Sequence, residues 1–166
     1  SSHKSGTDRC CEALKKAGQK YDCTINIQGD EPFINPEQIN LLAKCLKRKN
    51  TGIATLIKKI SNTDDLVNVN TPKVIINYRG EAIYFSRTPV PFFRNMPLEK
   101  WLKEHTYYKH IGIYGYKKEV LCKITDLPES PLESAESLEQ LRWIEAGFKI
   151  HTEITDQESI SIDTPE

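Results

Sequence analysis

The sequence predicts an α/β domain in which helices flank a mixed β-sheet. Segments with strand-like patterns alternate along the chain with segments that carry helix-capping signals, and this order is typical of α/β domains. Two of the strand-like runs are joined at Arg79-Gly80, which predicts a β-hairpin and therefore an antiparallel part of the sheet. With 166 residues, the chain suits a single domain over residues 1–166 and can bury a core without disulfide bonds.

The N-terminal half contains two predicted helices and two predicted strands. A helix is expected over residues 7–17, because Ser5 and Thr7 are good N-caps. A capping box at residues 35–38 precedes apolar residues at helical spacing, and it predicts a helix that ends near Lys49. Runs of β-favouring residues predict a buried strand over residues 23–28 and another strand over residues 52–60.

The C-terminal half contains the hairpin, two further strands and a longer helix. The predicted strands cover residues 73–78, 81–86, 110–116 and 149–154. Prolines at 89, 91 and 97 mark a loop, and a short polar-aromatic segment with some helical character follows at residues 101–108. A second capping box at residues 130–133, with Gly147 as the C′ residue, predicts one helix from Pro131 to Gly147.

This last helix has two unlike sides on a helical wheel. One side is apolar and contains Ala135, Leu138, Leu141 and Ile144. The other side contains Glu133, Glu136, Glu139, Gln140 and Trp143. Charged faces are usually solvated, but a residue as large as Trp143 favours either a packed element or a ligand on this side, and the pattern alone leaves both open.

Composition and charge exclude several classes of protein. The 23 basic and 23 acidic residues balance, so no overall field attracts nucleic acid or an anionic membrane, and we expect neither as a partner. No apolar run is long enough for a transmembrane helix, and the first residues do not form a signal peptide. The five cysteines are odd in number and lack metal-ligand spacing, which favours a reduced, cytoplasmic protein over a secreted disulfide scaffold.

The run from Thr24 to Pro32 is the most informative local feature. Its β-favouring residues lead to Gly29, and the carboxylates of Asp30 and Glu31 follow at once. Ligands of open α/β sheets bind at the carboxyl ends of strands, and Mg²⁺ prefers carboxylate oxygens. Asp30 is therefore a candidate metal ligand, although the same pattern is typical of a polar turn after a buried strand.

Six segments, taken together, resemble the 3-deoxy-manno-octulosonate cytidylyltransferases. They are HKSGTDR (3–9), NIQGDEPFI (26–34), PKVI…EAIYFSRTPVPF (72–92), KHIGIYGYKKE (109–119), SPLESAESLEQLRWIEAGFKIH (130–151) and IDTPE (162–166), in family order over nearly the whole chain. The resemblance implies a Rossmann-like nucleotidyltransferase sandwich that is usually a homodimer. It implies transfer of a cytidylyl group from CTP to the acidic sugar 3-deoxy-manno-octulosonate (Kdo), with release of pyrophosphate, for lipopolysaccharide synthesis.

The resemblance also implies roles for individual residues. Asp30 and Asp163 match the two aspartates that bind Mg²⁺ and are therefore the implied catalytic and metal-binding residues. The implied sugar-binding residues are Arg87, His110, Tyr114, Glu139 and Gln140. A guanidinium such as that of Arg87 suits the Kdo carboxylate, although Arg87 could equally form a salt bridge at a strand end. His110 and Tyr114 share one face of a strand by the period of two.

The implied nucleotide-binding residues are Ser5, Gly6, Thr7, Gln28 and Gly29. A small loop at the start of a helix offers free N–H groups and hydroxyls to such a ligand. The resemblance gives Lys73 and Trp143 no role, and packing stays one of the two open explanations for Trp143.

The two ends of the chain depart from the family pattern. Family members begin with a strand and a glycine-bearing loop whose arginine and lysine hold the triphosphate, and these 166 residues contain no such loop. Asp163-Thr164-Pro165-Glu166 reads as the start of a helix that the sequence does not continue. We therefore expect a chain truncated at both ends that has little transferase activity by itself. The alternatives are a related synthase for a sugar of the sialic-acid type and a non-catalytic binding or dimerisation fragment.

Overall fold

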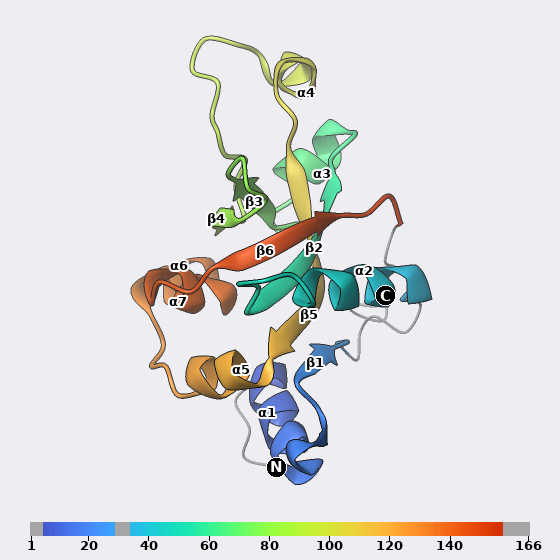
Figure 1. Ribbon diagram of the computed structural model, residues 1–166. Helices are drawn as coiled ribbons and strands as arrows, with labels where there is room; N and C mark the ends of the chain where they lie inside the picture. Colours follow the sequence, from blue (N-terminus) through green and yellow to red (C-terminus); the bar gives the residue numbers. More distant parts are fainter. Residues whose placement is uncertain (1–4, 29–33, 158–166) are drawn as a thin grey trace, which may run out of the picture.

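The computed structural model describes residues 5–28 and 34–157, which form a six-stranded sheet with helices on both faces (Figure 1). The strands are β1 (Cys23–Asn26), β2 (Ile53–Lys59), β3 (Lys73–Ile76), β4 (Ala82–Ser86), β5 (Tyr108–Lys117) and β6 (Ile150–Ile154). Their order is β4-β3-β5-β2-β6, and β1 also pairs with β5. β2 and β6 run parallel, whereas the other strand pairs in the described residues are antiparallel. The predicted mixed sheet and the β3–β4 hairpin are confirmed.

The helices form one layer on each face of the sheet. α2 (Pro36–Leu46) covers one face, and the other is covered by α1 (Gly6–Lys16), α5 (Lys118–Thr125), α6 (Pro131–Glu136) and α7 (Gln140–Glu145). Alternate residues of β2 divide the core accordingly. Ala54 and Leu56 pack with the apolar side of α2, whereas Ile53 and Ile57 belong to the larger cluster beneath α1, α5 and α7. The protein is thus the predicted α/β sandwich.

The long strand β5 organises the sheet. Along one edge it pairs with β2 over most of its length. Along the other edge its first residues, Tyr108 and Lys109, pair with β3, and its last residues, from Tyr114 onwards, pair with β1. Residues 110–113 lie between these two partners and have no strand beside them on that edge in the described part of the chain. A gap in the sheet therefore opens next to the middle of β5.

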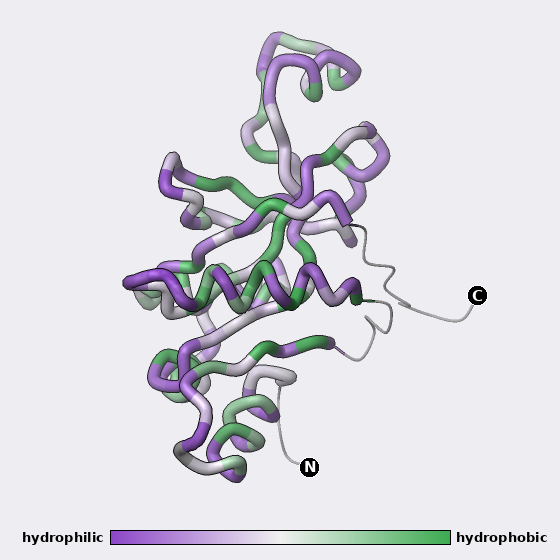
Figure 2. The backbone as a smooth tube through the Cα atoms, turned by 45° about the vertical axis from the view of Figure 1, so that its right-hand side comes forward, coloured by the Kyte–Doolittle hydropathy of each residue, from purple (hydrophilic) through white to green (hydrophobic). Residues whose placement is uncertain are grey.

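An arm formed by residues 88–107 extends beyond the sheet and is seen at the top of Figure 1. It contains the short helices η2 (Leu98–Lys100) and α4 (Trp101–Glu104). Trp101 and Tyr107 of the arm pack with Ile60 and with Leu66 of α3 (Thr63–Val67), in a small cluster separate from the main core. Figure 2 shows how far this arm stands from the sheet, with hydrophobic stretches near its end.

The predicted single helix from Pro131 to Gly147 is wrong, because the structure breaks it into α6 and α7. Ser137, at the break, has the left-handed conformation with φ of 51°. The side chain of Arg87 donates hydrogen bonds to the carbonyl oxygens of Glu136 (2.6 Å) and Ser137 (3.2 Å). These two oxygens are therefore bonded to Arg87 and not to the N–H groups of a continuous helix. A contact with a residue 49 positions away in the chain thus overrides the local helix pattern.

Other differences from the predictions have local reasons. The segment predicted as a buried strand at residues 23–28 is a half-exposed edge strand, since β1 pairs only with β5 in the described residues. The helices α3 and α5 were not predicted. α5 begins directly after β5, and its N-cap Lys117 makes no side-chain capping hydrogen bond, so the usual signal for a helix start is absent.

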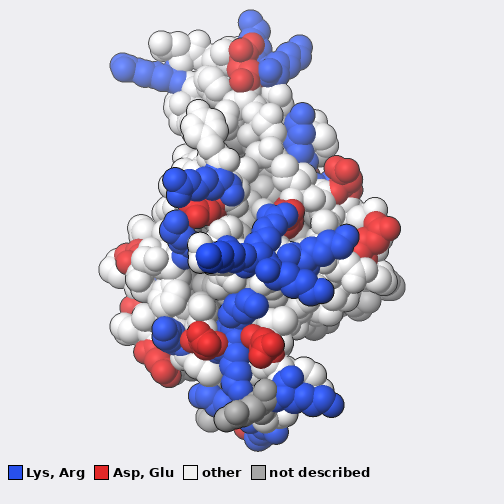
Figure 3. Space-filling model, in the orientation of Figure 1, with Lys and Arg blue, Asp and Glu red and all other residues white. Residues whose placement is uncertain are grey.

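The surface charges are distributed unevenly although they balance overall. Figure 3 shows Lys and Arg side chains gathered on the middle of the face across which α2 lies. Lys44, Lys47, Arg48 and Lys49, near the end of α2, are all exposed. Among the described residues, every helix is too short or too polar to cross a membrane.

Candidate functional site

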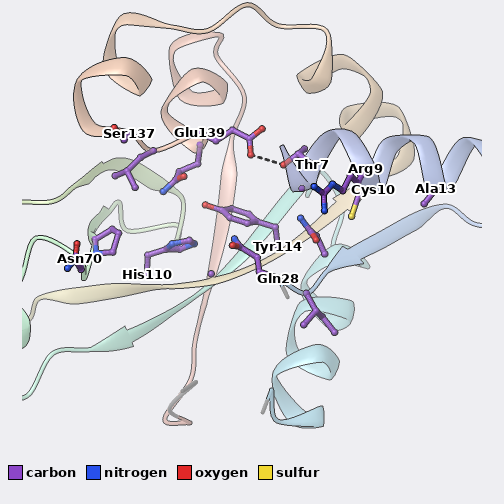
Figure 4. Close-up of a pocket in the computed structure, with 17 residues that line it drawn as sticks. Thr7, Arg9, Cys10, Ala13, Gln28, Asn70, His110, Tyr114, Ser137 and Glu139 are labelled. Atoms are coloured by element: carbon purple, nitrogen blue, oxygen red, sulfur yellow. Dashed lines mark hydrogen bonds between the residues drawn. The ribbon is translucent and has the colours of Figure 1, made fainter. Parts of the chain in front are cut away.

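A cavity of about 890 Å³ lies at the gap in the sheet beside β5. β5 forms its floor, the end of β1 and the segment before β3 border it, and α1 and the junction of α6 with α7 enclose it. Figure 4 shows that the labelled residues lie around an elongated space. Thr7 and Arg9 of α1 are at one end, and His110, Asn70 and Ser137 are at the other.

The α1 end of the cavity is set by a capping box. Ser5 caps α1 by accepting a hydrogen bond from the N–H of Asp8 (3.2 Å), and the Asp8 carboxylate accepts one from the N–H of Ser5 (3.1 Å). This start places Gly6 and Thr7 in the cavity wall. Ser5 itself lines a neighbouring cavity, which shares Ser137 and Glu139 with the first. Three predicted nucleotide-binding residues thus meet at one helix start, two of them in the main cavity.

Glu139 connects the two helical walls of the cavity. Its carboxylate accepts a 2.7 Å hydrogen bond from the hydroxyl of Thr7, which is 132 residues away in the chain (Figure 4). Burial raises the pKa of the Glu139 carboxyl, whereas hydrogen bonds from Thr7 and Ser5 oppose this rise. Arg142 forms a close ion pair with Glu133 and lies 3.9 Å from Glu139. Gln140 is buried and also lines the cavity, so the break before α7 places both predicted residues of this motif there.

His110 and Tyr114 both lie in the cavity wall, as the period of two along a strand predicts. The ring of His110 packs edge-on against Phe85, and its Nε2 lies 2.9 Å from the hydroxyl oxygen of Thr55. Burial lowers the pKa of His110 to about 3. The imidazole is therefore neutral near pH 7 and lacks the charge needed to neutralise a carboxylate by itself.

The hydroxyl of Tyr114 is a buried polar group in the cavity wall. Its side chain is 5% exposed, and its hydroxyl has no hydrogen-bond partner among the described residues. Burial raises the pKa of Tyr114 well above its ordinary value, so the hydroxyl stays protonated and can donate. A buried donor without a partner is costly, and a ligand in the cavity would relieve that cost.

Trp143 lies in the core and does not line the cavity. It is 1% exposed and packs edge-on against both Tyr114 and Tyr116, at centroid distances of 5.2 and 5.7 Å. Of the two explanations left open by the helical wheel, the packed element is therefore the one that applies to Trp143. Its indole ring packs against Tyr114 from within the core.

Arg87 lies behind the cavity wall and holds two parts of it together. Its guanidinium donates to the carbonyl oxygens of Glu136 and Ser137 and, at 2.9 Å, to that of Val69. These contacts tie the α6–α7 junction to the segment that carries Asn70. The predicted contact of Arg87 with a sugar carboxylate stays a prediction, because two of its five N–H groups are not used in these bonds.

Lys73 has a related position beneath the same segment. Its side chain is 1% exposed, and its ammonium donates a 2.8 Å hydrogen bond to the carbonyl oxygen of Asn68. Burial lowers the pKa of Lys73, and the neighbouring carboxylate of Glu136 partly opposes this. Lys73 and Arg87 therefore fix the carbonyl groups of residues 68 and 69.

Several predicted residues lie outside the described part of the chain. Gln28 is the last described residue before the first internal gap and lines the cavity. Gly29, Asp30 and Asp163 all fall outside the described residues. Within residues 5–28 and 34–157, no group of three or more histidine, cysteine, aspartate or glutamate side chains could hold a metal ion.

The cavity also contains residues for which the sequence predicted no role. Arg9, Asn26, Asn70 and Ser137 line it, and Thr55 contacts His110 from within the sheet. Arg9 is the last residue of the segment HKSGTDR (3–9), and its helical spacing from Gly6 could have predicted that it lines the cavity. Nothing in the sequence alone places Asn70 or Thr55 beside His110, because only the pairing of β2 and β3 with β5 does so.

Comparison with known proteins gives consistent matches. The family described as Cytidylyltransferase matches residues 1–153. The 3-deoxy-manno-octulosonate cytidylyltransferases of Parabacteroides distasonis and Bacteroides thetaiotaomicron are each 56% identical to this chain, over 99% of it and 67% of their own lengths. A solved structure of CMP:2-keto-3-deoxy-manno-octonic acid synthetase complexed with CTP is 41% identical, with a TM-score of 0.88 over 99% of this chain and 65% of that one. The chain spans about two thirds of the length of these relatives.

Proposed function

Because the chain belongs to the cytidylyltransferase family, among the 3-deoxy-manno-octulosonate cytidylyltransferases, we propose that its protein transfers a cytidylyl group from CTP to Kdo. The anomeric hydroxyl of Kdo loses its proton to solvent as its oxygen attacks the α-phosphorus of CTP. A new P–O bond forms, and pyrophosphate leaves with the electrons of the broken P–O bond. The CMP-Kdo that results serves lipopolysaccharide synthesis. The relative with bound CTP supports the choice of nucleotide, and the names of the relatives support the choice of sugar.

The observation that carries this proposal is that one cavity joins residues from both predicted sets. The predicted nucleotide-binding residues Gly6, Thr7 and Gln28 lie in its wall, on α1 and just after β1. The predicted sugar-binding residues in the wall are His110, Tyr114, Glu139 and Gln140, on β5 and at the α6–α7 junction. Two substrates held in one elongated cavity meet at its middle, and such positioning is a major part of catalysis of phosphoryl transfer.

We propose Mg²⁺ as the cofactor, held by Asp30 and Asp163. The support is the chemistry of the donor set, since two carboxylates leave coordination sites open for phosphate and sugar oxygens. When bound, Mg²⁺ would neutralise charge on the phosphates. The residues of the cavity wall would meanwhile orient the sugar, through the hydroxyl donor of Tyr114 and the carboxylate and amide of Glu139 and Gln140.

We also propose a homodimer that acts in the cytoplasm. The support for a dimer is the arm, whose Phe92 is 73% exposed next to a small apolar cluster. The support for a cytoplasmic location is that all five cysteines are free thiols. The oligomeric state can be measured by light scattering of the full-length protein, and a monomer would contradict this part of the proposal.

The test of the proposed function is a pyrophosphate-release assay on the full-length protein with CTP, Kdo and Mg²⁺. We expect turnover with Kdo and much slower turnover with a sialic acid; the opposite preference would favour the related synthase. The variant Asp30→Asn should lose most activity, and a full rate at limiting Mg²⁺ would contradict the role given to Asp30. Glu37→Gln, an exposed change on α2, serves as the control for substitution of an acidic residue.

A further inference from the structure

The pairing of β2 with β5 near His110 contains a bulge, and the buried hydroxyl of Thr55 forms a hydrogen bond with the bulged segment. β2 and β5 pair regularly as far as Thr55 and Tyr114, but the next residue of β2, Leu56, pairs with Ile111. Gly112 and Ile113 are therefore bulged out of the ladder. The carbonyl oxygen of Ile113 accepts a 2.8 Å hydrogen bond from the hydroxyl of Thr55, whose side chain is fully buried.

The same hydroxyl oxygen is in contact with His110. Its distance to Nε2 of the imidazole is 2.9 Å, whereas a second carbonyl, that of Ile111, is more distant at 3.4 Å. A hydroxyl has one proton to donate and two lone pairs, and a carbonyl oxygen can only accept. Thr55 and Ile113 are both satisfied if the hydroxyl gives its proton to Ile113 and accepts one from Nε2–H. The reverse arrangement would take the donor away from the Ile113 carbonyl.

We propose that Thr55 is a positioning residue that fixes His110 in the tautomer with its proton on Nε2, leaving Nδ1 as a hydrogen-bond acceptor for the ligand. In the described part of the chain, Nδ1 has no hydrogen-bond partner, and His110 lines the cavity. Phe85 and Tyr114 hold the ring in place, with centroid distances of 5.3 and 5.1 Å. The backbone N–H of His110 is also fixed, by a 2.9 Å bond to the carbonyl oxygen of Pro72.

The proposal assigns a chemical preference to the sugar end of the cavity and rests on the proposed function. An unprotonated Nδ1 pairs with a hydroxyl group of the sugar and repels a carboxylate. The carboxylate of the acceptor must then lie elsewhere. Nδ1 of His110 accepts a hydrogen bond from a hydroxyl group of the sugar, and Thr55 keeps Nδ1 unprotonated so that it can accept.

The first experiment is a measurement of the ring tautomer in the full-length enzyme. Long-range ¹H–¹⁵N correlation spectra distinguish a protonated from an unprotonated ring nitrogen, and His110→Gln assigns the signals. We expect Nε2 protonated and Nδ1 unprotonated at pH 7. A proton on Nδ1 would overturn the proposal.

The second experiment compares Thr55→Val with Thr55→Ser. Valine keeps the β-branched shape but removes the acceptor, so we expect a mixture of tautomers and a KM for Kdo raised about tenfold, with the KM for CTP changed less than twofold. Serine restores the hydroxyl and should restore both values. An unchanged tautomer in Thr55→Val, or no recovery in Thr55→Ser, would overturn the proposal.

A matched control lies directly beside Thr55 in the sheet. Thr152 of β6 pairs with Thr55 and is also buried, but its hydroxyl donates to the carbonyl oxygen of Gly80. Thr152→Val should leave the His110 tautomer and the KM for Kdo unchanged, and an effect equal to that of Thr55→Val would overturn the proposal. Failure of the proposed function would appear as no transfer from CTP to Kdo by the wild-type enzyme, whereas the tautomer is measured without substrate.

Discussion

The half-buried imidazole of His110 makes the stability of the fold depend on pH. Its pKa is about 3 in the folded protein, against an ordinary value of 6.5. Between these values the unfolded chain binds a proton at His110 that the folded protein does not bind. The free energy of unfolding therefore falls as the pH is lowered through this window, and this loss is absent above about pH 6.5.

The size of the effect follows from the two pKa values. Lowering the pH from 6.5 to 4.5 should reduce the free energy of unfolding by about 2 kcal/mol through this one group. In His110→Gln this contribution disappears, because glutamine does not titrate. The variant should lose about 2 kcal/mol less than the wild type over the same range, whatever its stability at pH 7.

Urea unfolding at pH 6.5, 5.5 and 4.5, followed by circular dichroism, measures this difference. His105→Gln is the matched control, since it removes an exposed histidine of the arm and should keep the slope of the wild type. Parallel pH dependences for the wild type and His110→Gln would refute the reasoning. They would mean that His110 binds its proton in the folded protein as readily as in the unfolded chain, so that its pKa is not lowered by folding.

Three further substitutions test the packing on the two faces of the sheet by urea unfolding. Arg87→Met removes three hydrogen bonds to carbonyl oxygens and should cost about 2–4 kcal/mol, and a loss below 1 kcal/mol would contradict its bridging role. Trp143→Phe should cost about 1–2 kcal/mol and leave the KM for CTP unchanged, because the indole packs outside the cavity. Gly115→Ala places a Cβ 2.7 Å from Cδ1 of Leu46 and should cost about 1–3 kcal/mol, whereas a neutral effect would show that Leu46 moves freely.

Much of the fold could be predicted because its signals are local. The N-cap at Ser5, the capping boxes at Asn35 and Ser130 and the β-favouring runs each act within a few residues. A helix begins after each of these three caps in the structure. The break at Ser137 could not be predicted in this way. It depends on Arg87, whose position next to residues 136 and 137 is decided by the packing of β4 against α7.

The candidate site was predictable to a similar extent. The period of two placed His110 and Tyr114 together, and the resemblance supplied Thr7 and Glu139, which form a hydrogen bond in the structure. The gap in the sheet could not be predicted, since it arises from the registers of β1 and β3 along β5. The contact of Thr55 with His110 depends on a bulge, and a single sequence gives no signal for it.

The central claim is that one cavity holds the nucleotide at α1 and the sugar at β5. A crystal structure of the full-length enzyme with its product CMP-Kdo tests this most directly. We predict the cytidine beside Gly6 and Thr7, and the Kdo moiety against His110 and Tyr114 with a hydroxyl group on Nδ1. Product bound in the reverse orientation, or outside this cavity, would contradict the account.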